Sequence, residues 1–128
     1  MPILRKMVGF VMTTDPERAK AFYGGVLGFK LVSDDPFAIA FDANGTMLRV
    51  TKAKEFTPAA HTILGWQVDD IHQALNKLVT AGVVFERYPG LPQDKDGICT
   101  FPGAAYVAWF KDPEGNVLSI SQHLAASS

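Results

Sequence analysis

The sequence predicts an α+β fold made of two tandem β-α-β-β-β modules, whose curved mixed sheets enclose a cleft. The first observation is a repeated pattern. "FDANGTMLRVTK" (residues 41–52) and "KDPEGNVLSISQ" (residues 111–122) both read aspartate, two variable residues, glycine and an alternating apolar run. The second observation is that the segments before the two copies follow the same order of strand and helix patterns. An alternating run after a glycine turn is typical of a strand, so the chain repeats one folding unit.

Module one is expected over about residues 3–52. Residues 3–12 form an apolar-rich run typical of a strand. The segment "TTDPERAKAFYGGVLGF" then predicts a helix, because Asp15 is a good N-cap, Pro16 suits the first helical position and Gly28 can end the helix. Three short strands over residues 29–32, 37–41 and 46–51 complete the module.

Module two is expected over about residues 61–122. It begins with a strand over residues 61–68 and a helix that Asp69 or Asp70 caps and Gly82 ends. A strand over 83–87, a proline-bearing loop over 88–97 and three extended segments follow; these segments cover residues 98–101, 106–110 and 116–121. Residues 53–60 are the expected linker, and residues 1–128 together are expected to form a single domain.

Composition narrows the choice of partners. The 128 residues carry a formal net charge of −1, which gives no electrostatic reason to expect nucleic acid or an anionic membrane. Cys99 is the only cysteine, so a disulfide within the chain and a cysteine zinc site are excluded. No apolar stretch approaches the roughly 20 residues of a membrane helix, and the first residues do not read as a signal peptide. We therefore expect a cytoplasmic protein.

Three stretches resemble the vicinal oxygen chelate superfamily: "TTDPERAKAFYGGVLGF", "GWQVDDIHQALNKLVTAGVVF" and "AWFKDPEGNVLSIS". This superfamily contains glyoxalase I, bleomycin-resistance proteins, fosfomycin-resistance enzymes and extradiol dioxygenases. The resemblance covers roughly residues 4–122. It implies paired β-α-β-β-β modules, each with a sheet that lines a binding cleft, and commonly a homodimer that shares its clefts between chains.

The resemblance also implies where a divalent metal ion would be held. The usual ligands are His, Glu or Gln, at the middle of each first strand and seven residues after the aspartate of each D-x-x-G turn. The residues here are Val8, Ile63, Arg49 and Ser119. Valine and isoleucine have no donor atom, arginine is a fixed cation, and a neutral serine hydroxyl is a poor ligand. We therefore expect neither a metal ion nor another cofactor.

Strand alternation predicts a ligand-binding face. The candidate ligand-binding residues are Phe10, Met12, Arg49, Thr51, Ile63, Gln67, Ser119 and Ser121. This mixture of apolar and polar side chains suits a small organic ligand that is anionic or aromatic, although the same residues could instead fill a collapsed core. Arg49 needs a partner if it faces inward. The alternatives are a ligand carboxylate or phosphate, a structural acid such as Asp42 or Glu55, or an extended position at the rim.

The histidines do not predict a metal cluster. If Ile63 and Ser119 lie level on parallel strands, His61 and His123 are separated by six residues along the strands, or roughly 20 Å. The two side chains therefore cannot share an ion. His61 alone is a candidate catalytic base, with a solvated strand end as the alternative.

These observations favour a metal-independent small-molecule-binding protein of the glyoxalase/bleomycin-resistance type, which sequesters its ligand in the cleft of a homodimer. One alternative is a lyase, isomerase or dioxygenase-type enzyme of the same superfamily. That alternative needs a metal ion or a base, and the four substituted positions argue against it. A second alternative is an interaction module with a filled core and no ligand.

Overall fold

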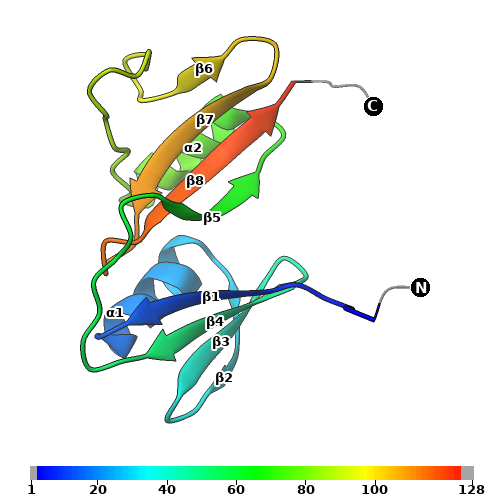
Figure 1. Cartoon of the computed structure of the whole chain (residues 1–128), viewed down its shortest axis with the longest axis vertical. Coiled ribbons are helices and arrows are strands. Elements are labelled where there is room, and N and C mark those ends of the chain that lie inside the picture. Colours follow the sequence, from blue (N-terminus) through cyan, green and yellow to red (C-terminus); the bar gives the residue numbers. More distant parts are fainter. Residues whose placement is uncertain (1–2, 125–128) are drawn as a thin grey trace. The chain divides into compact units, whose positions relative to one another are not determined.

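A computed structural model describes residues 3–124 of the chain. The chain divides into two compact units, Met1–Pro58 and Ala59–Ser128, and each contains one four-stranded sheet (Figure 1). The boundary falls within the predicted linker, and we call the units module one and module two. Each sheet mixes parallel and antiparallel pairs, which confirms the predicted α+β class. That the two modules act as a single domain stays a prediction.

Module one follows the predicted order. Its elements are β1 (Val8–Thr13), α1 (Pro16–Lys20), η1 (Ala21–Val26), β2 (Lys30–Asp34), β3 (Ala38–Ala43) and β4 (Thr46–Lys52). The strand order in the sheet is β1-β4-β3-β2, with β1 parallel to β4 and the other neighbours antiparallel. The helical segment between β1 and β2 is the crossover that carries the chain from one edge of the sheet to the other, so that β3 and β4 lie between them.

The first helix differs from the prediction in its second half. The Asp15 carboxylate accepts the Arg18 N–H at 3.3 Å, and Pro16 occupies the first turn, as the sequence predicts. After Lys20 the helix widens into the π-helix η1, where the Leu27 N–H donates to the Phe22 carbonyl at 2.9 Å. The predicted first strand is also too long, because residues 3–7 lie outside β1.

Module two contains β5 (Thr62–Gln67), α2 (Ile71–Thr80), β6 (Cys99–Phe101), β7 (Ala105–Lys111) and β8 (Val117–His123). Its strand order is β5-β8-β7-β6, which repeats the order of module one, and Figure 1 shows α2 behind β7 and β8. The Asp70 carboxylate caps α2 by accepting the Gln73 N–H at 3.1 Å, which decides between the two predicted caps. No helix in the described part of the chain is long and apolar enough to cross a membrane.

The predicted strand over residues 83–87 is wrong. Only Phe85 bridges to β7, opposite Phe110, and the Glu86 N–H donates to the Trp109 carbonyl. The chain then leaves the edge of β7 as a loop and returns to it as β6. The Gln93 side chain stabilises this loop, because its amide group donates to the Glu86 and Gly97 carbonyls. The outer edge of β7 is therefore paired by two short stretches, the bridge at Phe85 and the strand β6, with the loop between them.

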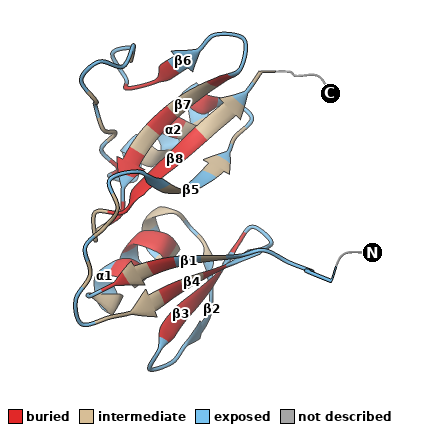
Figure 2. Ribbon diagram, viewed as in Figure 1, coloured by how far each residue is buried: buried red, intermediate tan, exposed pale blue. Residues whose placement is uncertain are grey.

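Each module has its core between one face of the sheet and its helix. In module one, Val11, Leu48 and Val50 are buried on this face, and Phe22 and Tyr23 are buried on η1. In module two, Ile71 and Leu75 of α2 are buried, together with residues of β7 and β8. Figure 2 shows buried residues along β3 and β8. The other face of each sheet is here called the open face, and within residues 3–124 no helix of the same module covers it.

The repeated D-x-x-G pattern forms two different turns. In the first copy, Asn44 and Gly45 have φ values of 60° and 101° and connect β3 to β4, which is typical of a two-residue hairpin turn. Asp42 accepts the Gly45 N–H at 2.6 Å. In the second copy, Asp112 accepts the N–H groups of Glu114 and Asn116, both at 2.9 Å. In both copies the aspartate stabilises the turn.

Candidate ligand-binding faces

The open face of module one brings together four of the predicted ligand-binding residues. Phe10 on β1 pairs with Arg49 on β4, and Met12 pairs with Thr51. Directly paired residues point to the same side of a sheet. The next pair along the same face is Val8 and Met47. The result is a band of apolar side chains that contains one guanidinium.

Arg49 is half-buried, with Phe10 paired on one side and Ala40 on the other. Among residues 3–124, the Arg49 side chain makes no ion pair or hydrogen bond. Neither Asp42 nor Glu55, the two predicted structural acids, is a partner of Arg49 within that range. The Arg49 charge contributes to the lowered pKa of Asp35, which is due mainly to the N–H groups of Ala38 and Phe37. The guanidinium therefore keeps its donors available on the open face.

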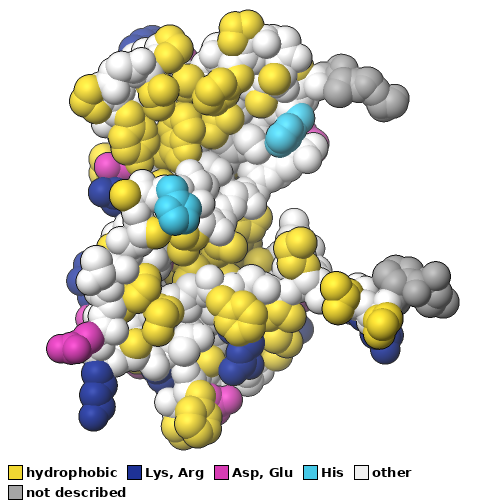
Figure 3. All heavy atoms as spheres, in the orientation of Figure 1, with side chains coloured by type: hydrophobic (Ala, Val, Ile, Leu, Met, Phe, Trp, Pro, Cys, Tyr) yellow, Lys and Arg dark blue, Asp and Glu magenta, His cyan; other side chains and the backbone are white. Residues whose placement is uncertain are grey.

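The open face of module two is more polar along β8. Ser119 pairs with Gly65, and Ser121 pairs with Gln67. The Ser121 hydroxyl lies 3.1 Å from the Nε2 atom of His123, which is exposed. In Figure 3 this part of module two shows hydrophobic side chains over β7, whereas most atoms over β8 are white, which marks other side chains and the backbone. Three of the predicted ligand-binding residues thus lie together: Gln67, Ser119 and Ser121.

Ile63 does not lie level with Ser119, as the sequence reasoning supposed. The register of β5 against β8 shifts between Thr62 and Leu64, so Ile63 lies in this irregularity. Gly65 is the residue level with Ser119. An ideal Cβ on Gly65 would lie 2.5 Å from the Ser119 Oγ, so a larger residue at this position would require the Ser119 hydroxyl to move. Sequence alternation alone does not reveal a register shift of this kind.

Trp109 is a residue of this face that the sequence reasoning did not place. It pairs with Ser119 on β7, and its indole N–H donates to the Thr62 hydroxyl at 3.1 Å. Tyr88 packs edge-on against it, with ring centroids 5.6 Å apart. Burial, and secondarily the Glu86 charge, raise the pKa of Tyr88. Trp109 therefore lies on the same face as Ser119 and Ser121. The pairing of β7 with β8 is the observation that places Trp109 on this face.

His61 lies just before β5 and is exposed. His123 is six residues beyond Val117, and Val117 pairs with Thr62. Because His61 lies one further residue before Thr62, the two histidines are about seven residues, or roughly 23 Å, apart along the strands, which is too far to share an ion. No group of three His, Cys, Asp or Glu side chains within residues 3–124 could hold a metal ion.

The superfamily's metal site does not fit the residues of this chain. Val8 and Arg49 lie on the open face of module one, Ile63 lies in the register shift of β5, and Ser119 leans over Gly65. None of these four side chains is a carboxylate, imidazole or amide. These side chains would offer a divalent ion at most one ligand, the neutral Ser119 hydroxyl, and the Arg49 guanidinium would repel the ion.

Comparison with known proteins identifies the family. The sequence profile of the Glyoxalase/Bleomycin resistance protein/Dioxygenase superfamily matches residues 6–120. This protein therefore belongs to that superfamily, as the resemblance of its motifs implied. No curated protein sequence matches the chain.

Solved structures with the same fold include proteins of different function. The antibiotic-binding protein TnmS3 from a Streptomyces species shares 26% identity, with a TM-score of 0.72 over 96% of this chain and 98% of that one. A lactoylglutathione lyase from Agrobacterium tumefaciens shares 18% identity, with a TM-score of 0.71 over 94% and 95% of the two chains. A superfamily member from Sphaerobacter thermophilus shares 22% identity, with a TM-score of 0.72 over 94% and 98%. The two less similar structures show the shared fold only.

Proposed function

We propose that this protein is a metal-independent binder of small organic molecules, and that its ligands are anionic or aromatic. One observation carries the proposal: the four positions at which the superfamily holds its metal ion lack suitable donors. These positions are Val8, Arg49, Ile63 and Ser119. The open faces keep their mixture of apolar and polar side chains, and such a mixture is typical of small-molecule sites.

Arg49 supports an anionic ligand. Its half-buried guanidinium has no ion pair or hydrogen bond with any residue from 3 to 124. A carboxylate or phosphate could receive two parallel N–H bonds from it, and Phe10 beside it could cover an apolar ring. Charge-assisted hydrogen bonds contribute about 1.5–3 kcal/mol, or roughly 10- to 150-fold in affinity.

Module two supports the same proposal, but it offers an aromatic ring and neutral polar groups in place of a cation. Trp109 offers an indole on the open face, although its N–H is already bonded to Thr62. Ser119, Ser121 and Gln67 offer hydroxyl and amide groups along the neighbouring strands. Aromatic walls beside a few polar groups suit a planar ligand with hydrogen-bonding substituents.

The neighbouring structures are consistent with this proposal. TnmS3, which is described as an antibiotic-binding protein, shares 26% identity with this chain. The lactoylglutathione lyase shares only 18% and supports the fold rather than an activity. An enzyme of lyase, isomerase or dioxygenase type stays the alternative, and turnover of any substrate would favour it.

We also propose a cytoplasmic homodimer. Module one exposes large apolar side chains, of which Met7 is 81% and Phe10 is 60% exposed. Exposed apolar surface of this kind is often covered by another protein surface. Sedimentation velocity at micromolar concentration should give twice the mass of one chain, whereas a monomer at every concentration would contradict the dimer.

A matched pair of aromatic probes tests the binding proposal. We expect 1-naphthoate to bind in the presence of EDTA and its neutral counterpart 1-naphthamide to bind at least about tenfold more weakly. Arg49→Ala should weaken naphthoate by a similar factor. Arg18→Ala, which removes the same charge from exposed Arg18 on α1, should change it less than about twofold.

Two outcomes would contradict the binding proposal. Loss of naphthoate binding on addition of EDTA would show that a metal ion is needed. Equal naphthoate affinity of wild type and Arg49→Ala would show that this guanidinium does not contact the anion.

A further inference from the structure

A pocket of about 340 Å³ lies at the hairpin end of module one. It is lined by residues of β2, β3, the β3–β4 turn, β4 and the segment before β1: Lys6, Val32, Phe41, Asp42, Gly45 and Met47. This volume is at the lower end of the roughly 300–1,000 Å³ that is usual for small-molecule sites. All of its lining belongs to one module.

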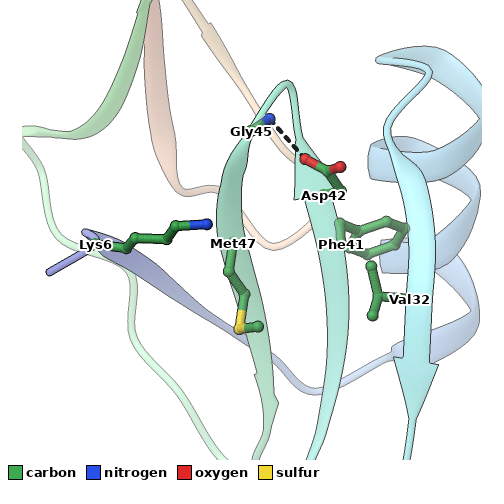
Figure 4. A pocket seen from close by; sticks show the side chains of 6 residues that line it. All are labelled: Lys6, Val32, Phe41, Asp42, Gly45 and Met47. Atoms are coloured by element: carbon green, nitrogen blue, oxygen red, sulfur yellow. Dashed lines mark hydrogen bonds between the residues drawn. The ribbon is translucent and has the colours of Figure 1, made fainter.

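The pocket contains two opposite charges that do not neutralise each other. Figure 4 shows Lys6 extending toward β4 from one side, and Asp42 near the end of β3 on the other. Neither Lys6 nor Asp42 makes an ion pair with any residue in the range 3–124. Asp42 uses one oxygen, Oδ1, to accept the Gly45 N–H at 2.6 Å. Its second oxygen and the three N–H donors of Lys6 remain available to a ligand.

The rest of the lining is apolar. Val32 is 56% and Met47 is 41% exposed, whereas Phe41 is buried and extends the apolar lining. Exposed valine and methionine side chains beside a pocket can cover an aliphatic group of a ligand. The pocket therefore combines a cation, an anion and an apolar surface.

We propose that this pocket binds the zwitterion of an α-amino acid with an apolar side chain. Lys6 receives the carboxylate, the free oxygen of Asp42 accepts the α-ammonium group, and the aliphatic side chain lies against Val32 and Met47. A simple anion would satisfy only Lys6, and a simple amine only Asp42. The proposal does not depend on Arg49, which is not part of the pocket lining.

One further charge lies near the pocket. Lys30 on β2 pairs in register with Asp42, so its side chain is on the same face, but it does not line the pocket. No residue between 3 and 124 forms an ion pair with Lys30. Lys30→Met is therefore the matched control for Lys6→Met, because it removes the same charge close to the same carboxylate.

Three probes of equal apolar size test the proposal by NMR titration. L-Leucine carries both charges, 4-methylpentanoate lacks the ammonium group, and 3-methylbutylamine lacks the carboxylate. We expect L-leucine to shift the Gly45 amide resonance in a saturable way, because that N–H is bonded to Asp42. Each probe with a single charge should bind at least about tenfold more weakly, since one charge-assisted contact is lost.

Substitutions of Lys6 and Asp42 test the contributions of the two charges separately. Lys6→Met and Asp42→Asn should each weaken L-leucine at least about tenfold, and asparagine keeps an acceptor for the Gly45 N–H. Lys30→Met and Arg49→Ala should change it less than about twofold. Leucine binding that survives in Arg49→Ala would support this pocket whatever the result with naphthoate.

Three outcomes would overturn the proposal. The first is the absence of a saturable shift at Gly45 with L-leucine. The second is 4-methylpentanoate binding as tightly as L-leucine, which would make the pocket an anion site. The third is an equal loss of leucine affinity in Lys30→Met and Lys6→Met, which would show a general charge effect.

Discussion

Arg49 and Ser119 occupy equivalent positions of the repeat but meet different neighbours. Arg49 lies between Phe10 and Ala40, whereas Ser119 lies between Gly65 and Trp109. The first position offers a cation beside an apolar ring, and the second offers a hydroxyl beside an indole. The duplicated fold therefore presents a chemically different environment at each of these two equivalent positions.

Gly65→Ala tests the close contact between Gly65 of β5 and the Ser119 hydroxyl of β8. Its Cβ would lie 2.5 Å from the Ser119 Oγ, so we expect a loss of about 1–3 kcal/mol in the free energy of unfolding. The double variant Gly65→Ala/Ser119→Ala should recover most of this loss, because the clashing oxygen is removed. Urea denaturation measures both. A double variant no more stable than Gly65→Ala would show that the contact with Ser119 is not the cause.

At the scale of one element, α2 depends on its N-cap. The Asp70 carboxylate accepts the Gln73 N–H, so Asp70→Ala should lower the free energy of unfolding by about 1 kcal/mol. Asp69→Ala is the matched control, since it removes the same charge one position earlier. Thermal denaturation of both variants measures the difference. Equal losses would indicate a charge effect rather than the cap.

Three elements of module one are joined by Asp34. This residue of β2 accepts from Lys20 of α1 at 2.8 Å and from Lys52 of β4 at 2.7 Å. These lysines lower the pKa of Asp34, and the carboxylates of Asp34 and Glu17 raise the pKa of Lys20. The Asp34 contribution to stability is therefore present above its unfolded pKa of 3.8 and is lost as the pH falls through the lower folded value.

The pH dependence of Tm in wild type and Asp34→Asn measures this contribution. Wild type should melt at a higher temperature near neutral pH. The difference should shrink as the pH falls below 3.8 and disappear below the lower folded pKa, where Asp34 is protonated in both states. At high pH the difference should shrink again, as Lys20 loses its proton above 10.5. Asp96→Asn, in the exposed loop, is the control. A Tm difference that does not change with pH would contradict the role of these ion pairs.

At the scale of the whole molecule, local signals predicted most of the fold. Asp15 with Pro16 predicted the start of α1, and Asn44 with Gly45 is the residue pair that a hairpin turn requires. The repeated pattern predicted two similar sheets, and both have the same strand order. These features are determined by residues that are close together in the sequence, so they can be predicted from the sequence alone.

The features that the sequence missed depend on long-range pairing. Residues 83–87 are rich in β-branched and aromatic side chains, as a strand would be, but only Phe85 bridges to β7 and only the Glu86 N–H bonds to it before the loop begins. The face of Trp109 and the register of Gly65 follow from β7–β8 and β5–β8 pairing. Of the candidate site, the strand pattern assigned Phe10, Met12, Arg49 and Thr51 to one face, and the structure places them there.

The most direct test of metal independence is the metal stoichiometry of the purified protein. The chain is prepared without chelator, offered Zn²⁺, Ni²⁺, Mn²⁺ and Fe²⁺ in turn, desalted, and analysed by inductively coupled plasma mass spectrometry. We expect near-zero stoichiometry with every ion, because valine, isoleucine, arginine and serine stand at the positions where the family resemblance implies metal ligands. About one retained ion per chain would contradict the proposal and would favour the enzyme alternative.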